Sequence, residues 1–276
     1  MEQIEILLST YFGAEFLEQQ INSLLNQSYK DIRITIRDDG SNDSTISIIK
    51  NYIERFPHQI NLMPGCENIG SKRSFMKLLE NATSDYIMFC DQDDVWLPDK
   101  VLDTLIEMRR LEQLYGSEYP LLVFTDLIPT DANLQPIATS LWHMQRLDPH
   151  LTLFWKKLLA QNVVTGCTIM VKKNICPFLA PFASLTVHHD QLIAVVASKY
   201  GHISWIDRPT IYYRQHDRNV VGASKFNFKY IFDKIKNIKN IINFFIDASN
   251  CFEHEINIIE LFYLKILINI SRAVKK

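Results

Sequence analysis

The sequence predicts an α/β protein with a mostly parallel central sheet, flanking helices and a helical appendage at the carboxyl end. Strand-like and helix-like stretches alternate three times over residues 4–96, the pattern of a βαβ series with right-handed crossovers. The run 86–90 is wholly apolar, as in a strand buried on both faces, and acidic residues follow it directly. From residue 225 onward lysines alternate with apolar residues, and this change of character marks the appendage.

Short apolar or β-branched runs predict the strands, and apolar residues at helical spacing predict the helices. The strand runs are, in order, 4–8, 32–36, 60–63, 86–90, 121–125, the turn and strand of 163–171, 203–207 and 210–213, the last two separated by Pro209. The helical runs are 16–25, 44–53, 71–79, 98–114, 151–160 and 191–200. Two further amphipathic helices are expected in the appendage, so we divide the chain into a domain of residues 1–223 and a region of residues 224–276.

Composition narrows the class of protein. The 276 residues carry a formal net charge of -2, so no global field favours a nucleic-acid partner. Five cysteines include no CxxC pair, which predicts reduced thiols and a cytoplasmic protein. The amino terminus is acidic and resembles no signal peptide. No uncharged apolar run approaches the roughly 18 residues that a membrane span needs.

Three carboxylates, Asp91, Asp93 and Asp94, follow the apolar run 86–90. Ligand sites of open α/β sheets lie at the carboxyl ends of strands. Carboxylates packed there repel one another unless a cation compensates them, and Mg²⁺ or Mn²⁺ prefers such oxygen ligands. The alternative is a solvated loop that opens the next helix, with Asp99 as its cap.

A second acidic turn, Asp38-Asp39-Gly40-Ser41, follows the strand run 32–36. It is expected at the same edge of the sheet as Asp91–Asp94. A carboxylate before Gly-Ser also suits an Asx-type turn. Asp39 is therefore either a binding residue at this edge or a residue that only stabilises the turn.

The appendage has two readings as well. Lysines 225, 229, 234, 236 and 239 lie among aromatic and β-branched residues. One reading is a basic amphipathic face on an anionic membrane surface, at the inner face of the cell membrane. The other is a helical hairpin packed on the domain or on a second subunit of a homodimer.

Several short motifs together resemble a known family. They are Ser9-Thr10-Tyr11, Asp38-Asp39-Gly40-Ser41 with Asp43-Ser44-Thr45, Asn68-x-Gly70, Cys90-Asp91-Gln92-Asp93-Asp94-Val95-Trp96, Gly166-Cys167, His189-Asp190 and Tyr213-Arg214-Gln215-His216-x-x-Asn219-x-x-Gly222. In this order they resemble glycosyltransferase family 2, and most closely its bacterial rhamnosyltransferase-like branch. The resemblance covers roughly residues 1–223. It implies a GT-A, Rossmann-like fold and transfer of a sugar, with inversion, from a nucleotide sugar to an acceptor hydroxyl.

The resemblance also implies roles for particular residues. Asp93 is expected to be the most direct ligand of Mn²⁺ or Mg²⁺, with Asp91 near the ribose or a metal-bound water. Asp190 is the candidate general base, with helix capping as its alternative. The resemblance further implies that Asp39 binds the nucleobase, that Thr10 and Tyr11 line the nucleotide slot, and that Gly166 lies beside a sugar. It implies that Arg214 contacts the pyrophosphate, and that His216 is a third metal ligand or another pyrophosphate contact. Lys72 or Arg73 is expected near the phosphates or on a solvated helix face. Asp94, His188 and His189 receive no firm role.

The function expected from these residues is a metal-dependent glycosyltransferase of bacterial cell-surface polysaccharide synthesis. The donor is dTDP-L-rhamnose or a UDP-hexose, and the acceptor is a glycan or a lipid-linked sugar. The alternative is a non-catalytic nucleotide-sugar-binding subunit of a polysaccharide assembly complex. A nucleotidyltransferase is disfavoured, because Ser9-Thr10-Tyr11-Phe12-Gly13 is not the Gly-rich basic loop that such an enzyme needs after its first strand.

Overall fold

The computed structural model describes residues 2–65, 67–217, 238–252 and 255–274. Within them eight strands form one sheet in the order β3-β2-β1-β4-β7-β6-β8-β5. Their bounds are β1 Ile4–Thr10, β2 Ile32–Asp38, β3 Ile60–Leu62, β4 Tyr86–Cys90, β5 Val95–Trp96, β6 Leu121–Thr130, β7 Met170–Lys172 and β8 His202–Arg214. The α/β class expected from the sequence is confirmed.

The sheet is mostly parallel, with two antiparallel insertions. Strands β3, β2, β1 and β4 run parallel, and so do β6 and β8. Strand β7 is antiparallel to both of its neighbours, and β5 is antiparallel to β8. The carboxyl ends of β2 and β4 therefore meet at one edge, on either side of β1.

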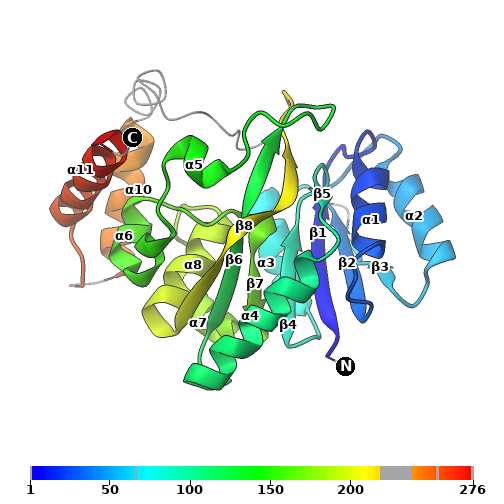
Figure 1. Ribbon diagram of the computed structural model, residues 1–276, viewed down its shortest axis with the longest axis horizontal. Coiled ribbons are helices and arrows are strands. Elements are labelled where there is room, and N and C mark those ends of the chain that lie inside the picture. Colours follow the sequence, from blue (N-terminus) through cyan, green and yellow to red (C-terminus); the bar gives the residue numbers. More distant parts are fainter. Residues whose placement is uncertain (1, 66, 218–237, 253–254, 275–276) are drawn as a thin grey trace.

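Helices cover both faces of the sheet (Figure 1). The α-helices are α1 Leu17–Leu25, α2 Thr45–Arg55, α3 Ser71–Asn81, α4 Lys100–Tyr115, α5 Leu141–Gln145, α6 Trp155–Ala160, α7 Cys176–Leu179, α8 His189–Tyr200, α10 Ile238–Cys251 and α11 Ile258–Val274. The 3-10 turns are η1 Pro149–Leu153, η2 Gly166–Thr168, η3 Lys173–Ile175 and η4 Ala180–Phe182.

Each face of the sheet has its own hydrophobic core, because successive residues of a strand point to opposite sides. Tyr86, Met88 and Cys90 of β4 face the core under α1, α2 and α4. Ile87 and Phe89 face the core under α3, α6 and α8, which α10 and α11 extend. A strand buried on both faces explains why 86–90 is apolar throughout.

Two local expectations need correction. Residues 203–207 and 210–213 are not two strands but one, β8, whose pairing with β6 shifts in register around Asp126, opposite Pro209. The irregularity lets a proline, which has no N–H to donate, remain within a strand. Residues 151–160 were expected as one helix, but η1 and α6 are separated by Phe154, whose backbone is extended.

The appendage contains the two helices α10 and α11, and α11 packs on α6 (Figure 1). No helix among the described residues is long and apolar enough to cross a membrane. The expected basic stretch from Lys225 to Lys236, together with Asn219 and Gly222, lies outside the described residues, as does Cys66. The four cysteines within the described ranges are free.

Candidate active site

The acidic loop at the end of β4 is the centre of the candidate site. It is held between β4 and β5, and β5 pairs with the end of β8. Ligand atoms of Asp91, Asp94 and Cys167 all lie within 4.8 Å of one another. Asp94 is fully buried, and its Oδ1 accepts a hydrogen bond from the backbone N–H of Arg214 at 3.0 Å. Its Oδ2 is buried without a hydrogen-bond partner among the described residues.

Negative charge is crowded in this loop. Asp91 keeps part of its surface exposed, yet burial of its carboxyl group, with the charges of Asp93 and Asp190, raises its pKa to about 7. Burial, followed by the charges of Asp93 and Asp91, raises the pKa of Asp94 well above its ordinary value. Carboxylates in such a setting keep their protons to a higher pH than usual, and a nearby positive charge favours their ionised form.

One buried cation lies beside the acidic loop. Lys100, the first residue of α4, is 1% exposed, and its Nζ lies 4.6 Å from the ring centroid of Trp96. Burial lowers its pKa to about 8, against the attraction of Cys167, Cys90 and Asp94. Its ammonium has no hydrogen-bond partner in the described part of the chain. Even together with the buried Arg214, whose charge attracts Asp94 and Asp93, this lysine leaves part of the charge of the three aspartates uncompensated.

The residues present fit a hard divalent cation. Mg²⁺ and Mn²⁺ take carboxylate oxygens, and the orphaned Oδ2 of Asp94 lies among such oxygens. Burial and the nearby carboxylates raise the pKa of the Cys167 thiol well above its ordinary value, so this group stays protonated at neutral pH. The oxygen donors are therefore the ligands on offer.

Asp93 of the acidic loop is paired with His216, which follows β8. Nε2 of His216 lies 2.8 Å from Oδ2 of Asp93. The His216 ring packs on Phe16, with ring centroids 5.0 Å apart. The expected ligands Asp93 and His216 are thus neighbours, whereas Asp91 faces Asp94. Sequence reasoning left Asp94 without a role, although it is the most buried carboxylate of the three.

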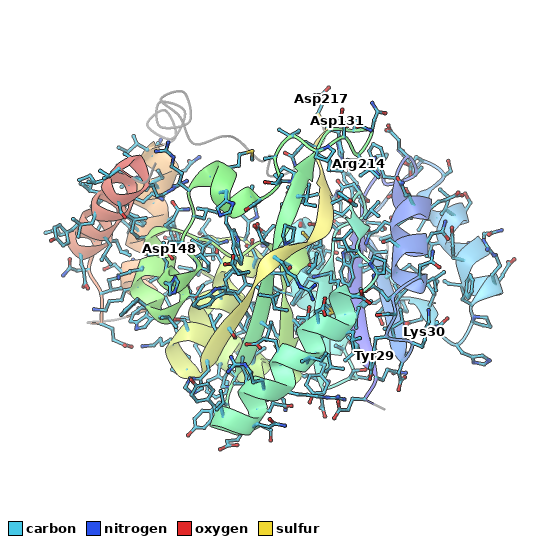
Figure 2. The ribbon with its side chains drawn as sticks, viewed as in Figure 1. Tyr29, Lys30, Asp131, Asp148, Arg214 and Asp217 are labelled. Carbon is cyan, nitrogen blue, oxygen red and sulfur yellow. The ribbon has the colours of Figure 1, made fainter. Side chains whose placement is uncertain are left out.

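Arg214, the last residue of β8, binds the backbone of the acidic loop. Its Nε donates to the carbonyl of Asp93 at 2.7 Å, and its Nη2 donates to Oε1 of Gln19 at 2.5 Å. The guanidinium also lies over the Phe16 ring, 4.4 Å from its centroid, and bonds the Ala132 carbonyl. Figure 2 shows Arg214 at the upper end of β8. These contacts bind its guanidinium to the protein, and a direct pyrophosphate contact stays a prediction.

In the second acidic turn, Asp38 stabilises the turn itself, whereas Asp39 makes other contacts. Asp38 caps the turn, since Oδ2 accepts the N–H groups of Gly40 and Ser41 at 3.1 and 2.7 Å. Its Oδ1 also accepts the hydroxyl of Thr10, which is thereby committed to the protein. Tyr11 remains 46% exposed beside this turn.

Asp39 is buried and paired with a residue that sequence reasoning missed. Nη1 of Arg37 lies 2.5 Å from its Oδ1, and both residues are almost inaccessible to solvent. The N–H groups of Ile69 and Gly70 donate to its two oxygens at 2.9 and 2.8 Å. A charged residue directly before the acidic pair was the available signal, because a buried strand rarely carries an unpaired arginine.

Asp190 lies in the first turn of α8. Its Oδ1 accepts the N–H of Gln191 at 2.7 Å, and its Oδ2 accepts Nδ2 of Asn162 at 3.3 Å. Burial raises the pKa of Asp190, against a lowering by His188. Asp91 and Asp190 interact electrostatically, so the two ends of the candidate site converge.

His189 and Gly166 form the wall next to Asp190. The His189 ring stacks on Phe75 at a centroid distance of 4.2 Å, and burial lowers its pKa to about 3, so it is neutral. A Cβ at Gly166 would come within 2.9 Å of His189 Nε2, which explains the glycine by close approach to this ring. The ammonium of Lys72 bonds the carbonyls of Ala183 and Leu185, and its charge also acts on His189.

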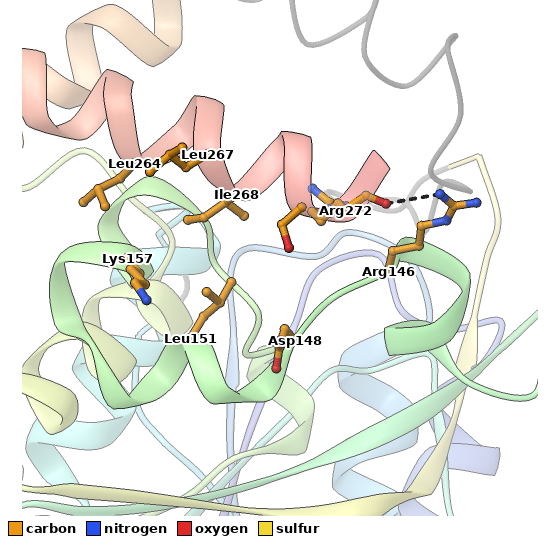
Figure 3. Close-up of a pocket in the computed structure, with 9 residues that line it drawn as sticks. Arg146, Asp148, Leu151, Lys157, Leu264, Leu267, Ile268 and Arg272 are labelled. Atoms are coloured by element: carbon orange, nitrogen blue, oxygen red, sulfur yellow. Dashed lines mark hydrogen bonds between the residues drawn. The ribbon is translucent and has the colours of Figure 1, made fainter. Parts of the chain in front are cut away.

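A separate cleft of about 300 Å³ opens between α11 and the segment η1–α6 (Figure 3). Leu151, Leu264 and Ile268 are among the residues that line it. None of the residues that line it belongs to the candidate site, so the cleft is not the place of the chemistry.

The mixed eight-stranded sheet, with an acidic loop at the carboxyl end of a central parallel strand, has the arrangement of the GT-A fold that the sequence led us to expect. Residues 5–117 match the family model described as "Glycosyl transferase family 2". This match covers less than half of the chain, and it confirms the resemblance to the family that the motifs indicated.

Among named relatives, the chain is 27% identical to the dTDP-rhamnosyl transferase RfbG of Shigella flexneri, over 84% of this chain and 79% of that protein. It is 39% identical to an uncharacterized glycosyltransferase of Haemophilus influenzae, over 37% of this chain and 40% of that protein.

Solved structures share the fold at low sequence identity. S. aureus TarS in complex with UDP superposes with a TM-score of 0.60 at 13% identity, over 95% of this chain and 69% of that one. The mannosyltransferase PcManGT of Pyrobaculum calidifontis, in complex with GDP-Man and Mn²⁺, gives a TM-score of 0.55 at 16% identity, over 99% and 76% of the two chains.

Proposed function

We propose that this chain is an inverting, metal-dependent glycosyltransferase that moves L-rhamnose from dTDP-rhamnose, or a hexose from a UDP-sugar, to a hydroxyl of a bacterial cell-surface glycan. Residues 1–223 are its glycosyltransferase domain, and residues 224–276 are an appendage. The enzyme works in the cytoplasm, where nucleotide sugars are made.

The observation that carries this proposal is the crowding of negative charge around Asp91. Burial and the charges of Asp93 and Asp190 together raise its pKa to about 7. A protein gains nothing in stability from gathering several carboxylates in one buried place. The arrangement is expected where a cation and a proton acceptor must both face a reacting group.

The residues that would hold the metal are Asp93 and Asp91, with Asp94 behind them. A divalent cation, when bound, neutralises the charge that develops on the departing diphosphate. His216 orients the carboxylate of Asp93 through their 2.8 Å contact. Arg214 holds the backbone of the acidic loop in position by its hydrogen bond to the carbonyl of Asp93.

Asp190 acts on the acceptor side. Its carboxylate takes the proton of the acceptor hydroxyl while the new bond to the anomeric carbon forms and the bond to the diphosphate oxygen breaks. Asn162 and the N–H of Gln191 hold the carboxylate in place. The pKa of Asp190, raised by burial, makes it a stronger proton acceptor than an exposed aspartate.

Asp39 serves the nucleobase. Thymine and uracil both present a ring N–H, and a carboxylate oxygen accepts it. Arg37 orients the carboxylate of Asp39 through their ion pair, in which Nη1 lies 2.5 Å from Oδ1. Thr10 supports the neighbouring turn through Asp38, and the exposed Tyr11 lies beside it.

The choice of dTDP-rhamnose is supported by the relative named as a dTDP-rhamnosyl transferase, which aligns with 84% of this chain. The metal is supported by the structural neighbour solved with GDP-Man and Mn²⁺. Asp190, which interacts electrostatically with Asp91, adds a proton acceptor that a non-catalytic binding subunit does not need.

The test is release of nucleoside diphosphate from dTDP-rhamnose, UDP-glucose and GDP-mannose, each with Mn²⁺ and with a chelator. We expect dTDP release that requires the metal and that Asp190→Asn reduces at least about 100-fold. No release from any of the three donors, despite a thermal shift on binding, would instead identify a non-catalytic nucleotide-sugar-binding subunit.

A further inference from the structure

The last helix, α11, turns its charged side chains toward the protein. Glu260 Oε1 lies 2.9 Å from Nζ of Lys156 on α6. Lys265 donates to the carbonyl of Ala160 at 2.8 Å. Arg272 is 3% exposed and donates to the carbonyl of Gln145. Every acidic or basic residue between Ile258 and Val274 thus contacts the domain.

The outer face of α11 is apolar. Its large exposed side chains recur at helical spacing and form one stripe, which we call the α11 ridge: Ile259 77%, Tyr263 60%, Ile266 56%, Leu267 43%, Ile270 55% and Val274 75% exposed. The other exposed positions within α11 are Ser271 and Ala273. A surface helix of a globular protein shows the opposite arrangement, with its apolar stripe inward and its charges outward.

We propose that the α11 ridge docks on the surface of a lipid bilayer that contains anionic lipid. A helix lying in the interface buries its apolar face about 5–10 Å deep, which matches a single ridge on a protein surface. No helix of the described residues is able to span a membrane, so α11 lies on the bilayer and does not cross it.

A second copy of the chain fits this ridge less well. The 17 residues of α11 extend about 26 Å, and a ridge about 10 Å wide offers roughly 260 Å². A stable dimer buries about 800 Å² per partner. The neighbouring helix α10 adds only two exposed apolar residues, Ile238 and Ile246. Its other exposed residues are polar: Lys239, Asn240, Asn243 and Asn250.

Charge in the sequence favours anionic headgroups. Lys275 and Lys276 follow α11 directly, and residues 225–239 contain five lysines and one aspartate. Each lysine near an anionic surface raises binding about fivefold. The adjoining cleft, which shares Leu267 with the ridge, is also lined by Lys157 and, at the end of α11 near Arg272, by Arg146 (Figure 3).

The inner face of α11 is linked by hydrogen bonds to the candidate base. Lys265 and Arg272 both donate to Oε1 of Gln161, at 2.9 and 3.2 Å. Gln161 donates to the carbonyl of Asn162, whose Nδ2 donates to Asp190. If the proposed function is right, docking therefore orients the acceptor side of the site toward a lipid-linked sugar; the docking itself does not depend on that function.

The test compares two double variants that remove equally exposed apolar residues from different helices. Ile266→Glu with Ile270→Glu changes the ridge, where the two are 56% and 55% exposed. Ile106→Glu with Leu114→Glu is the control on α4, where the two are 57% and 59% exposed. Full-length proteins are sedimented with vesicles of phosphatidylcholine plus phosphatidylglycerol and with vesicles of phosphatidylcholine alone. Thermal melting verifies that all are folded.

We expect the wild type and the α4 control to bind the anionic vesicles, and the ridge variant to bind about 100-fold more weakly. Donor hydrolysis in solution should be the same in all three, which separates this proposal from the proposed function. Three results would overturn the proposal. They are an equal loss of vesicle binding in the α4 control, equal binding of the wild type to vesicles without phosphatidylglycerol, and no binding of the wild type to either kind of vesicle. A concentration-dependent dimer that only the ridge variant loses would identify a second copy as the occupant.

Discussion

Nε2 of His216 lies 2.8 Å from Oδ2 of Asp93, across 123 positions of the sequence. The contact brings the end of β8 against the acidic loop that follows β4. Phe16 lies beneath both His216 and Arg214, so the loop is shaped by three separate segments of the chain.

Replacing Asp93 should stop sugar transfer. We expect Asp93→Ala to lower kcat/KM at least about 1,000-fold, because the metal loses its nearest carboxylate. The variant should fold normally, since it removes one of several neighbouring carboxylates and the contact that this one makes with His216. Asp99→Ala is the matched control: Asp99 is exposed at the start of α4 and makes no side-chain capping bond. Near wild-type turnover in Asp93→Ala would remove this residue from the metal site.

Asp190→Asn separates the base from the helix cap. Asparagine keeps an oxygen for the N–H of Gln191, so the local structure is retained. We expect kcat to fall about 100- to 10,000-fold while the dissociation constant of the donor stays nearly constant. Calorimetry of donor binding alongside steady-state kinetics measures both. A parallel loss of donor affinity would indicate a structural role.

Much of this architecture could be predicted from the sequence, because the information was local. The apolar run 86–90 and the carboxylates after it predicted a buried strand and its functional end. The partners of Arg37, Lys100 and Arg214 could not be predicted, since each is set by elements distant in the chain. Arg214 was expected at the pyrophosphate, but its contacts to Asp93 and Gln19 depend on how β8 meets α1.

The single strand β8 escaped prediction for a different reason. Proline usually ends a strand, and Pro209 divided the apolar pattern in two. The register shift opposite Asp126 accommodates it, and a shift of this kind has no signature in the sequence of one strand alone.

The Arg37–Asp39 pair should stabilise the fold and the nucleotide slot together. Arg37→Met leaves a buried carboxylate unpaired, so we expect the free energy of unfolding to fall by about 3–5 kcal/mol. The double variant Arg37→Met, Asp39→Asn should recover part of that loss but still bind dTDP and UDP weakly. Urea denaturation and nucleotide titration check the two effects. Full nucleotide affinity in the double variant would exclude Asp39 from the base contact.

Metal should stabilise the protein more at pH 8 than at pH 5. The pKa of Asp91 is raised to about 7 in the folded chain, whereas the unfolded chain releases that proton near pH 4. Between these values the folded state holds more protons, so stability falls as pH rises and is lowest above about pH 7. Mn²⁺ replaces the proton and removes the loss. Melting temperatures with Mn²⁺ and with chelator at both pH values check this, and a shift independent of pH would contradict it.

Binding of a cation at the acidic loop is the most direct test of the account. A crystal grown with dTDP and Mn²⁺ should show anomalous density within about 2.0–2.3 Å of carboxylate oxygens of the Asp91–Asp94 loop, with the ion touching both phosphates. Density for the nucleotide at another place, with no ion at these carboxylates, would contradict the assignment of the site and the function drawn from it.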